Sequence, residues 1–168
     1  MRTQEAVFDF ETFFHAHYER IARAIARVVK DPARAEDLAA EVFWKFWREP
    51  RARGEQAGGW LYRTAVRLAL DELRRFARRS RYEQMSGRGC EPPTPEEVHA
   101  AAEEQAQVRF VLGQLDPRQA ELLILRSEGL SYGELAAALD LNPASVGTFV
   151  SRAQQAFRKE YVRQYGAQ

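Results

Sequence analysis

Apolar residues recur every three or four positions along most of the chain, which is the spacing of helices with one buried face. The first stripe lies between residues 10 and 28 and ends before Lys30-Asp31-Pro32. Aspartate is a favoured N-cap and proline a favoured first helical residue, so a second helix is expected from Pro32 to about Arg48. No alternating strand pattern competes with these stripes, and the sequence therefore predicts an all-α fold.

A third helical stripe begins after the flexible pair Gly58-Gly59. Its apolar side consists of Trp60, Leu61, Ala65, Leu68 and Leu73. Together with the first two helices it predicts a small helical bundle that ends near residue 82.

A change of composition separates the two halves of the chain. Residues 1–82 carry 17 Lys or Arg against 12 Asp or Glu, residues 83–104 carry one against six, and residues 105–168 carry seven against six. The middle segment also concentrates Gly and Pro and has no aromatic residue, which is typical of a solvated linker. We therefore expect two small helical domains, 1–82 and 105–168, joined by a flexible acidic linker, 83–104. Its acidity favours solubility; alternatively, it shields a basic surface until a partner displaces it.

The C-terminal part of the chain has the pattern of a helix-turn-helix. Ser131 and Glu134 have the spacing of a capping box, which starts one short helix. Residues 140–142 form the turn, and Asn142 followed by Pro143 starts the last helix. The predicted buried face of that last helix consists of Val146, Phe149, Val150 and Ala153.

The opposite face of the last helix carries short polar side chains and an arginine, which suit phosphates and base edges in a major groove. These residues are Ser145, Thr148, Ser151, Arg152 and Gln155. We interpret this segment as a recognition helix, and a plain helical hairpin with a solvated face is the alternative.

Two features of the N-terminal domain point to partners. On the second helix, Asp37, Glu41 and Trp44 share a side that the buried stripe leaves free, which suggests a protein-binding patch with an apolar anchor. Alternatively, Trp44 covers a second core face. On the third helix, aromatic residues precede an arginine cluster, a combination that suits single-stranded or opened DNA. These residues are Trp60, Tyr62, Arg63, Arg67, Arg74, Arg75, Arg78, Arg79 and Arg81.

Three segments in order resemble a bacterial RNA polymerase sigma factor of the extracytoplasmic-function (ECF) group of the sigma-70 family. They are DPARAEDLAAEVFWKFW, WLYRTAVRLALDELRR and LDPRQAELLILRSEGLSYGELAAALDLNPASVGTFVSRA. The resemblance covers nearly the whole chain. It implies that the first domain binds core RNA polymerase and helps to open the promoter, and that the second reads an upstream element as duplex DNA. An anti-sigma factor is a further partner that it implies.

Carried over residue by residue, the resemblance places Asp37 and Glu41 against a helical coiled coil of the large polymerase subunit. The segment that faces the melted strand then contains Trp60, Arg63, Asp71, Arg74 and Arg75. The recognition helix contains Ser145, Thr148, Ser151 and Arg152.

The sequence also departs from the family pattern. The family often has glutamine where Ala40 stands and asparagine where Arg67 stands, which predicts altered polymerase and strand contacts. Where the family usually adds arginines, this chain has Gln154 and Gln155, which predicts a weaker hold on phosphates.

Other classes of protein are disfavoured. The single cysteine, Cys90, cannot form an internal disulfide, and the three histidines lack zinc-ligand spacing. No side chains assemble into a recognisable catalytic site, so we predict no enzyme, no cofactor, no metal and no small-molecule substrate. No apolar run reaches the roughly 18 residues of a membrane helix, and no secretory signal core is evident, so we expect no membrane partner and a cytoplasmic location.

Two alternatives to the sigma-factor reading remain at this stage. One is a stand-alone helix-turn-helix regulator that dimerises through its N-terminal bundle and binds a two-fold symmetric operator. The other is a decoy that binds polymerase or an anti-sigma factor and has no promoter activity.

Overall fold

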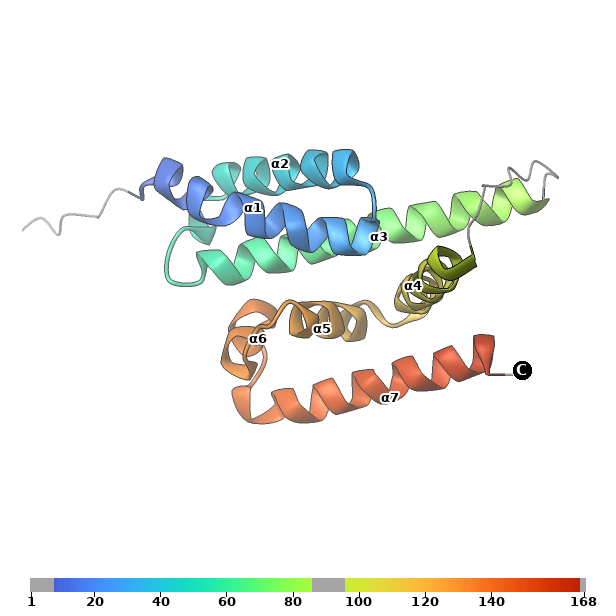
Figure 1. Cartoon of the computed structure of the whole chain (residues 1–168). Helices are drawn as coiled ribbons and strands as arrows, with labels where there is room; N and C mark the ends of the chain where they lie inside the picture. The colour runs from blue at the N-terminus through green and yellow to red at the C-terminus, as the bar shows by residue number, and fades with distance from the viewer. Residues whose placement is uncertain (1–7, 86–95, 167–168) are drawn as a thin grey trace, which may run out of the picture.

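The computed structural model describes residues 8–85 and 96–166, and no side chain of 80, 81, 83–85 or 96–101 is described. Within these ranges the chain forms helices and no strand, as predicted (Figure 1). The elements in order are α1 (Phe10–Val29), α2 (Pro32–Arg48), the 3-10 turn η1 (Pro50–Ala52), α3 (Ala57–Met85), α4 (Glu96–Gln114), α5 (Pro117–Ser127), α6 (Tyr132–Leu139), the 3-10 turn η2 (Pro143–Ser145) and α7 (Val146–Tyr165).

The helix starts follow the capping residues in the sequence. The side chains of Asp9 and Asp31 accept hydrogen bonds from the backbone N–H groups of Thr12 and Arg34, respectively. Each cap satisfies an N–H that has no partner inside its helix. The predicted boundaries of α2, Pro32 and Arg48, are confirmed.

The first three helices pack around a core that is rich in aromatic side chains. Ile21 of α1, Val42 of α2 and Leu61 of α3 are fully buried. Phe46 is also fully buried, and its ring centroid lies 5.0 to 6.4 Å from four other aromatic rings. Those rings belong to Phe8, Phe10, Phe13 and Trp60. The aromatic cluster around Phe46 fixes the position of Trp60, one of the predicted DNA-contacting residues.

The third helix differs from its predicted course at both ends. It begins at Ala57, so Gly58 and Gly59 lie inside its first turn and not before it. It continues to Met85, and α4 begins at Glu96, so both helices extend into the predicted linker 83–104. Composition marked this segment as polar, and polar helices share that composition with linkers. Cys90 lies outside the described residues, as does the side chain of Arg81.

The helix-turn-helix has the predicted architecture. Ser131 and Glu134 form the capping box that starts α6, with hydrogen bonds of 3.3 and 2.7 Å. Asp140 ends α6 in the left-handed conformation, with φ of 54°. Asn142 caps the 3-10 turn η2, and the α-helical part starts three residues later than predicted, at Val146.

We expect Ser131→Ala to lower the free energy of unfolding by about 1 kcal/mol, because it removes the side-chain acceptor for the Glu134 N–H. Urea unfolding followed by circular dichroism measures this change. Ser127→Ala is the matched control, since the Ser127 hydroxyl donates to the Ile124 carbonyl in the last turn of α5 and caps no N–H group. The control should change stability by less than about 0.5 kcal/mol. Equal losses in the two variants would contradict the capping role.

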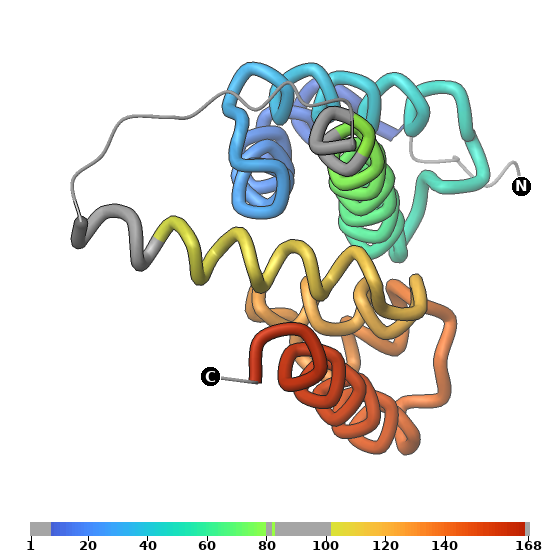
Figure 2. Tube along the Cα trace, turned by 90° about the vertical axis from the view of Figure 1, so that its right-hand side faces the viewer, coloured from blue at the N-terminus to red at the C-terminus, as the bar shows by residue number. Residues whose placement is uncertain are grey.

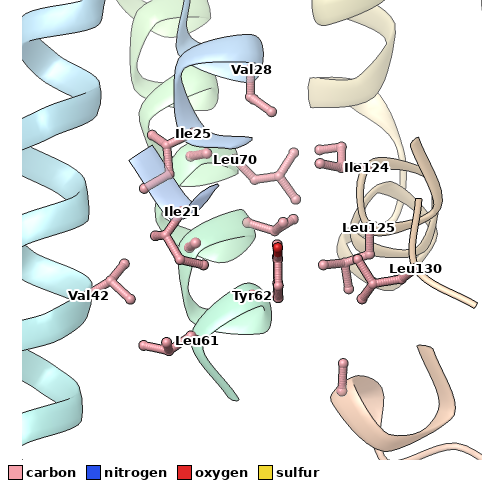
Figure 3. Close-up of a cluster of buried hydrophobic side chains, with 14 of the residues drawn as sticks. Ile21, Ile25, Val28, Val42, Leu61, Tyr62, Leu70, Ile124, Leu125 and Leu130 are labelled. Carbon is pink, nitrogen blue, oxygen red and sulfur yellow. The ribbon is translucent and has the colours of Figure 1, made fainter. Parts of the chain in front are cut away.

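The two domains pack against each other through α3. The helices α1 to α3 lie on one side of the molecule and α5 to α7 on the other, with α3 facing the C-terminal helices (Figures 1 and 2). Tyr62 and Leu70 of α3 face an apolar cluster of the second domain, which consists of Ile124, Leu125 and Leu130 (Figure 3). One continuous apolar core therefore joins the domains.

The contact between α3 and α6 depends on a glycine. A Cβ atom at Gly59 would lie 3.2 Å from the Cα atom of Ala138, closer than an ordinary van der Waals contact. The close approach explains why α3 has a glycine here, although glycine in a helix costs about 1 kcal/mol relative to alanine. None of the helices in the described ranges is long and apolar enough to cross a membrane.

Candidate functional site

The first candidate surface lies on α2 and consists of Asp37, Glu41 and Trp44, which we call the docking face. Trp44 is 60% exposed, so the alternative that it covers a second core face is wrong. The side chains of Asp37 and Glu41 are 74% and 45% exposed. An exposed indole beside two carboxylates is the composition of an apolar anchor with an acidic rim.

Basic neighbours hold the carboxylates of the docking face in place. Lys45 Nζ lies 2.9 Å from Glu41 Oε1, and Arg34 lies 3.9 Å from Asp37 Oδ2. Arg34 also donates a 3.0 Å hydrogen bond to Glu72 of α3. This bond, together with the charges of Arg34 and Arg75, lowers the pKa of the Glu72 carboxyl against the opposing effect of burial. The docking face is thereby tied to α3.

Sequence analysis did not single out Trp47, which extends the exposed aromatic surface of α2. Its side chain is 50% exposed, its ring meets that of Phe10 edge-on at 4.9 Å, and the guanidinium of Arg53 lies 5.2 Å from the ring centroid. The available signal was a second tryptophan on α2 that lies outside the buried stripe.

The second candidate surface is a row along one side of α3, consisting of Trp60, Arg63, Arg67 and Arg74, which we call the strand row. The structure places these four residues together, on the side of α3 that meets the C-terminal domain. Arg67 Nε donates to Glu121 Oε1 at 2.8 Å, and a second contact to Oε2 measures 3.4 Å. Arg74 donates to the carbonyl groups of Gly113 and Leu115 at 3.4 and 3.2 Å.

The other two members of the strand row, Trp60 and Arg63, line a cavity of about 310 Å³ between α3, the preceding loop and α6. Ala137 and Ala138 of α6 form one wall of this cavity, and Arg51, Ala52, Gly54, Glu55 and Gln56 line the rest. The first helix of the helix-turn-helix therefore borders the predicted strand-contacting residues.

The remaining arginines of α3 lie further along the helix. Arg75, Arg78 and Arg79 are exposed, as is Asp71. Phe76, which sequence analysis did not single out, is 64% exposed among these arginines. Tyr62, near the start of α3, lies instead in the domain contact, and its burial there raises the pKa of its hydroxyl. The predicted DNA-contacting residues of α3 thus divide into a row that meets the second domain and an exposed basic group.

The third candidate surface lies on α7. Thr148, Ser151 and Arg152 are exposed, as predicted for a recognition helix. Ser145 lies in η2, before the α-helical part, and is half-buried. Gln154 and Gln155 are exposed as well, and so is Ala40 on α2.

A second cavity, of about 270 Å³, brings residues of both predicted DNA surfaces together. Arg67 of the strand row and Arg152 of α7 both line it, with Arg118 beside them and Leu122, Leu139, Leu141 and Phe149 as its apolar part. This volume is near the lower limit for a small-molecule pocket.

Comparisons with known proteins match both domains. Residues 13–79 match the family model of Sigma-70 region 2, and residues 105–156 match that of Sigma-70, region 4. The RNA polymerase sigma-E factor of Streptomyces coelicolor is 31% identical over 165 residues, which cover 93% of this chain and 88% of that protein. The ECF RNA polymerase sigma factor SigE of Mycolicibacterium smegmatis is 28% identical over 98% of this chain, which spans 66% of that relative's length.

Two solved structures share the fold. The sigma factor RpoE from Bartonella quintana, in complex with the anti-sigma factor NepR, has a TM-score of 0.53 at 20% identity. The match covers 92% of this chain and 97% of the RpoE chain. CnrH in complex with the cytosolic domain of CnrY has a TM-score of 0.54 at 22% identity, with coverage of 89% and 85%.

Proposed function

This chain belongs to the sigma-70 family of RNA polymerase sigma factors, in its extracytoplasmic-function group, and we propose that it binds core RNA polymerase, directs it to specific promoters and assists DNA opening. The observation that carries this proposal is the presence of two domains, matched in order to regions 2 and 4, over most of the chain. Each domain presents an exposed surface suited to one of these partners.

We propose that the docking face binds core polymerase. Asp37 and Glu41 supply negative charge and Trp44 supplies an apolar anchor, and their exposure supports this role. Complementary charge steers association and fixes the register of the two surfaces. Ala40 in place of the family's frequent glutamine lies on the exposed side of the same helix and should alter the contact.

We propose that α3 binds the opened strand of the promoter and that α7 binds promoter DNA as a duplex. The aromatic and arginine side chains of the strand row, with Arg75, Arg78 and Arg79, suit stacking on bases and contact with phosphates of the opened strand. The short polar side chains of α7 with Arg152 suit the major groove of a duplex. Binding of the opened strand would offset the few kcal/mol that unstacking each base step costs.

The chain would carry out no bond chemistry in this role, because the polymerase forms the phosphodiester bonds. Its place of action would be the cytoplasm, where polymerase and promoters meet. The structurally similar RpoE is bound to an anti-sigma factor, so a protein of that class is a further candidate partner for this chain.

Run-off transcription tests the proposal. Core RNA polymerase is incubated with genomic fragments from the source organism, with and without the chain, and transcripts are mapped. We expect discrete start sites that depend on the chain. Binding to polymerase without any dependent transcript would favour the decoy. A stable homodimer that does not bind polymerase but footprints a symmetric site would favour the stand-alone regulator.

A further inference from the structure

We infer that the cavity of about 270 Å³ lined by α3, α5, α6 and α7, which we call the α5 cavity, binds a small carboxylate that carries one apolar ring. Neither polymerase binding nor promoter binding requires such a ligand, so the inference goes beyond the proposed function and does not rest on it. The class of ligand follows from the size of the cavity, its apolar side chains and its charges.

The α5 cavity is built almost entirely by the C-terminal domain. Its lining residues come from the first two turns of α5, the end of α6 with the turn that follows, and the first two turns of α7, with Arg67 added from α3. Asp116 caps the start of α5, and Asn142 caps the turn before α7. These caps fix where the lining segments begin, so the cavity is formed before any ligand arrives.

Leucine and phenylalanine side chains form the apolar part of the α5 cavity. Leu122 and Leu139 are 4% and 8% exposed, and Leu141 and Phe149 are partly buried against the same core. An apolar ring in contact with them would remove their remaining surface from water, which is favourable. An engineered apolar cavity of about 150 Å³ holds benzene, and larger ligands occupy pockets of about 300 to 1,000 Å³. The α5 cavity therefore suits one ring with a small substituent.

The charges of the α5 cavity favour a singly charged anion. Three arginines and two carboxylates line it, which leaves one positive charge in excess. Both carboxylates already have partners, since Glu121 accepts from Arg67 Nε at 2.8 Å and Asp116 accepts from the Arg118 backbone N–H at 3.0 Å. Within residues 8–85 and 96–166, the guanidinium groups of Arg118 and Arg152 make no hydrogen bond or ion pair. Two unpaired guanidinium groups are thus available to an anion.

The arrangement on α7 joins the charged part of the cavity to its apolar part. Arg152 follows Phe149 by three residues, so the two side chains share one side of the helix. A guanidinium binds a carboxylate through two parallel N–H donors, and the neighbouring phenyl ring can pack against the ring of the same ligand. A free anion would leave the apolar part unused, and a neutral ring would leave the arginines unpaired. A ring carboxylate satisfies both.

Titration of the full chain with sodium benzoate, followed by proton–nitrogen correlation NMR at constant ionic strength, tests the site. We expect saturable shifts of the amide signals of Gln119, Leu141 and Phe149, with a Kd of about 1 mM or below, which is within reach of a ligand of this size. Acetate lacks the ring and benzyl alcohol lacks the charge. Each should bind at least about tenfold more weakly than benzoate.

A substitution in the cavity connects these shifts to the proposed contacts. Arg118→Ala should weaken benzoate binding about fivefold or more, because it removes one unpaired guanidinium group. The Arg118 side chain is exposed, so the fold should tolerate the change. Arg158→Ala is the matched control, because Arg158 is exposed on α7 and does not line the cavity. It removes the same charge and should keep the affinity within about twofold.

Three results would overturn the inference. One is the absence of saturable shifts at benzoate concentrations up to about 20 mM, well above the expected Kd. Another is equal affinity for benzoate and acetate, which would mean that surface arginines attract any anion. The third is an equal loss of affinity in Arg118→Ala and Arg158→Ala, which would assign the effect to total charge. Run-off transcription tests the proposed function separately, and its outcome does not depend on benzoate.

Discussion

The double substitution Asp37→Arg, Glu41→Arg is expected to weaken binding to core RNA polymerase by about 100-fold or more, and to abolish run-off transcripts with it. The reason is electrostatic, because reversing two charges at a complementary interface replaces attraction with repulsion that costs several kcal/mol. The folded chain should tolerate the change, since both carboxylates are exposed and their pairs with Arg34 and Lys45 contribute at most about 1 kcal/mol each. Surface plasmon resonance on immobilised core polymerase measures the affinity.

The matched control reverses two exposed carboxylates elsewhere. Glu19→Arg on α1 with Glu104→Arg on α4 adds the same charge away from the docking face. It should bind polymerase within about threefold of the unmodified chain. If the control loses as much affinity as the docking variant, the effect comes from total charge and the assignment of the docking face is incorrect.

Phe46→Ala is expected to lower the free energy of unfolding by about 3 to 5 kcal/mol, a large part of the 5 to 15 kcal/mol typical of a folded domain. The substitution removes the ring at the centre of the aromatic cluster, where neighbouring side chains cannot collapse fully into the space. Because Trp60 packs on this ring, strand binding should weaken as well. Urea unfolding followed by circular dichroism measures the loss.

Phe76→Ala is the matched control for size and residue type. Phe76 is 64% exposed on α3, so its removal should change stability by less than about 0.5 kcal/mol. A loss below about 1 kcal/mol for Phe46→Ala would contradict the packing described above.

Much of the fold could be predicted because local signals mark it. Asp31-Pro32 and the Ser131–Glu134 pair fix helix starts through hydrogen bonds within three residues, so the sequence around each start is sufficient. The course of α4 into the acidic segment was missed, because a polar composition is compatible with both a helix and a linker. The extra turn at η2 depends on Asn142 binding the N–H of Ala144, which capping preferences alone do not distinguish from an α-helical start.

The sequence pattern names candidate residues for the site but not what surrounds them. Trp44 and Arg152 are exposed as expected, because an amphipathic pattern reveals which side of a helix is not apolar. That pattern does not reveal what covers the polar side. Arg67 and Glu121 are 54 residues apart, and no periodicity connects them. The roles of the docking face, the strand row and α7 remain predictions that the variants above address.

At Gly59 the stability of the first turn of α3 and the close packing of α3 against α6 favour different residues. An alanine there would strengthen the first turn of α3 by reducing the conformational freedom of the unfolded chain. The same methyl group would need α6 to shift by a few tenths of an ångström, since it would meet the backbone of Ala138. The gain within α3 is thus opposed by a loss at the contact between the domains, so the more stable residue at position 59 depends on how far α6 can move.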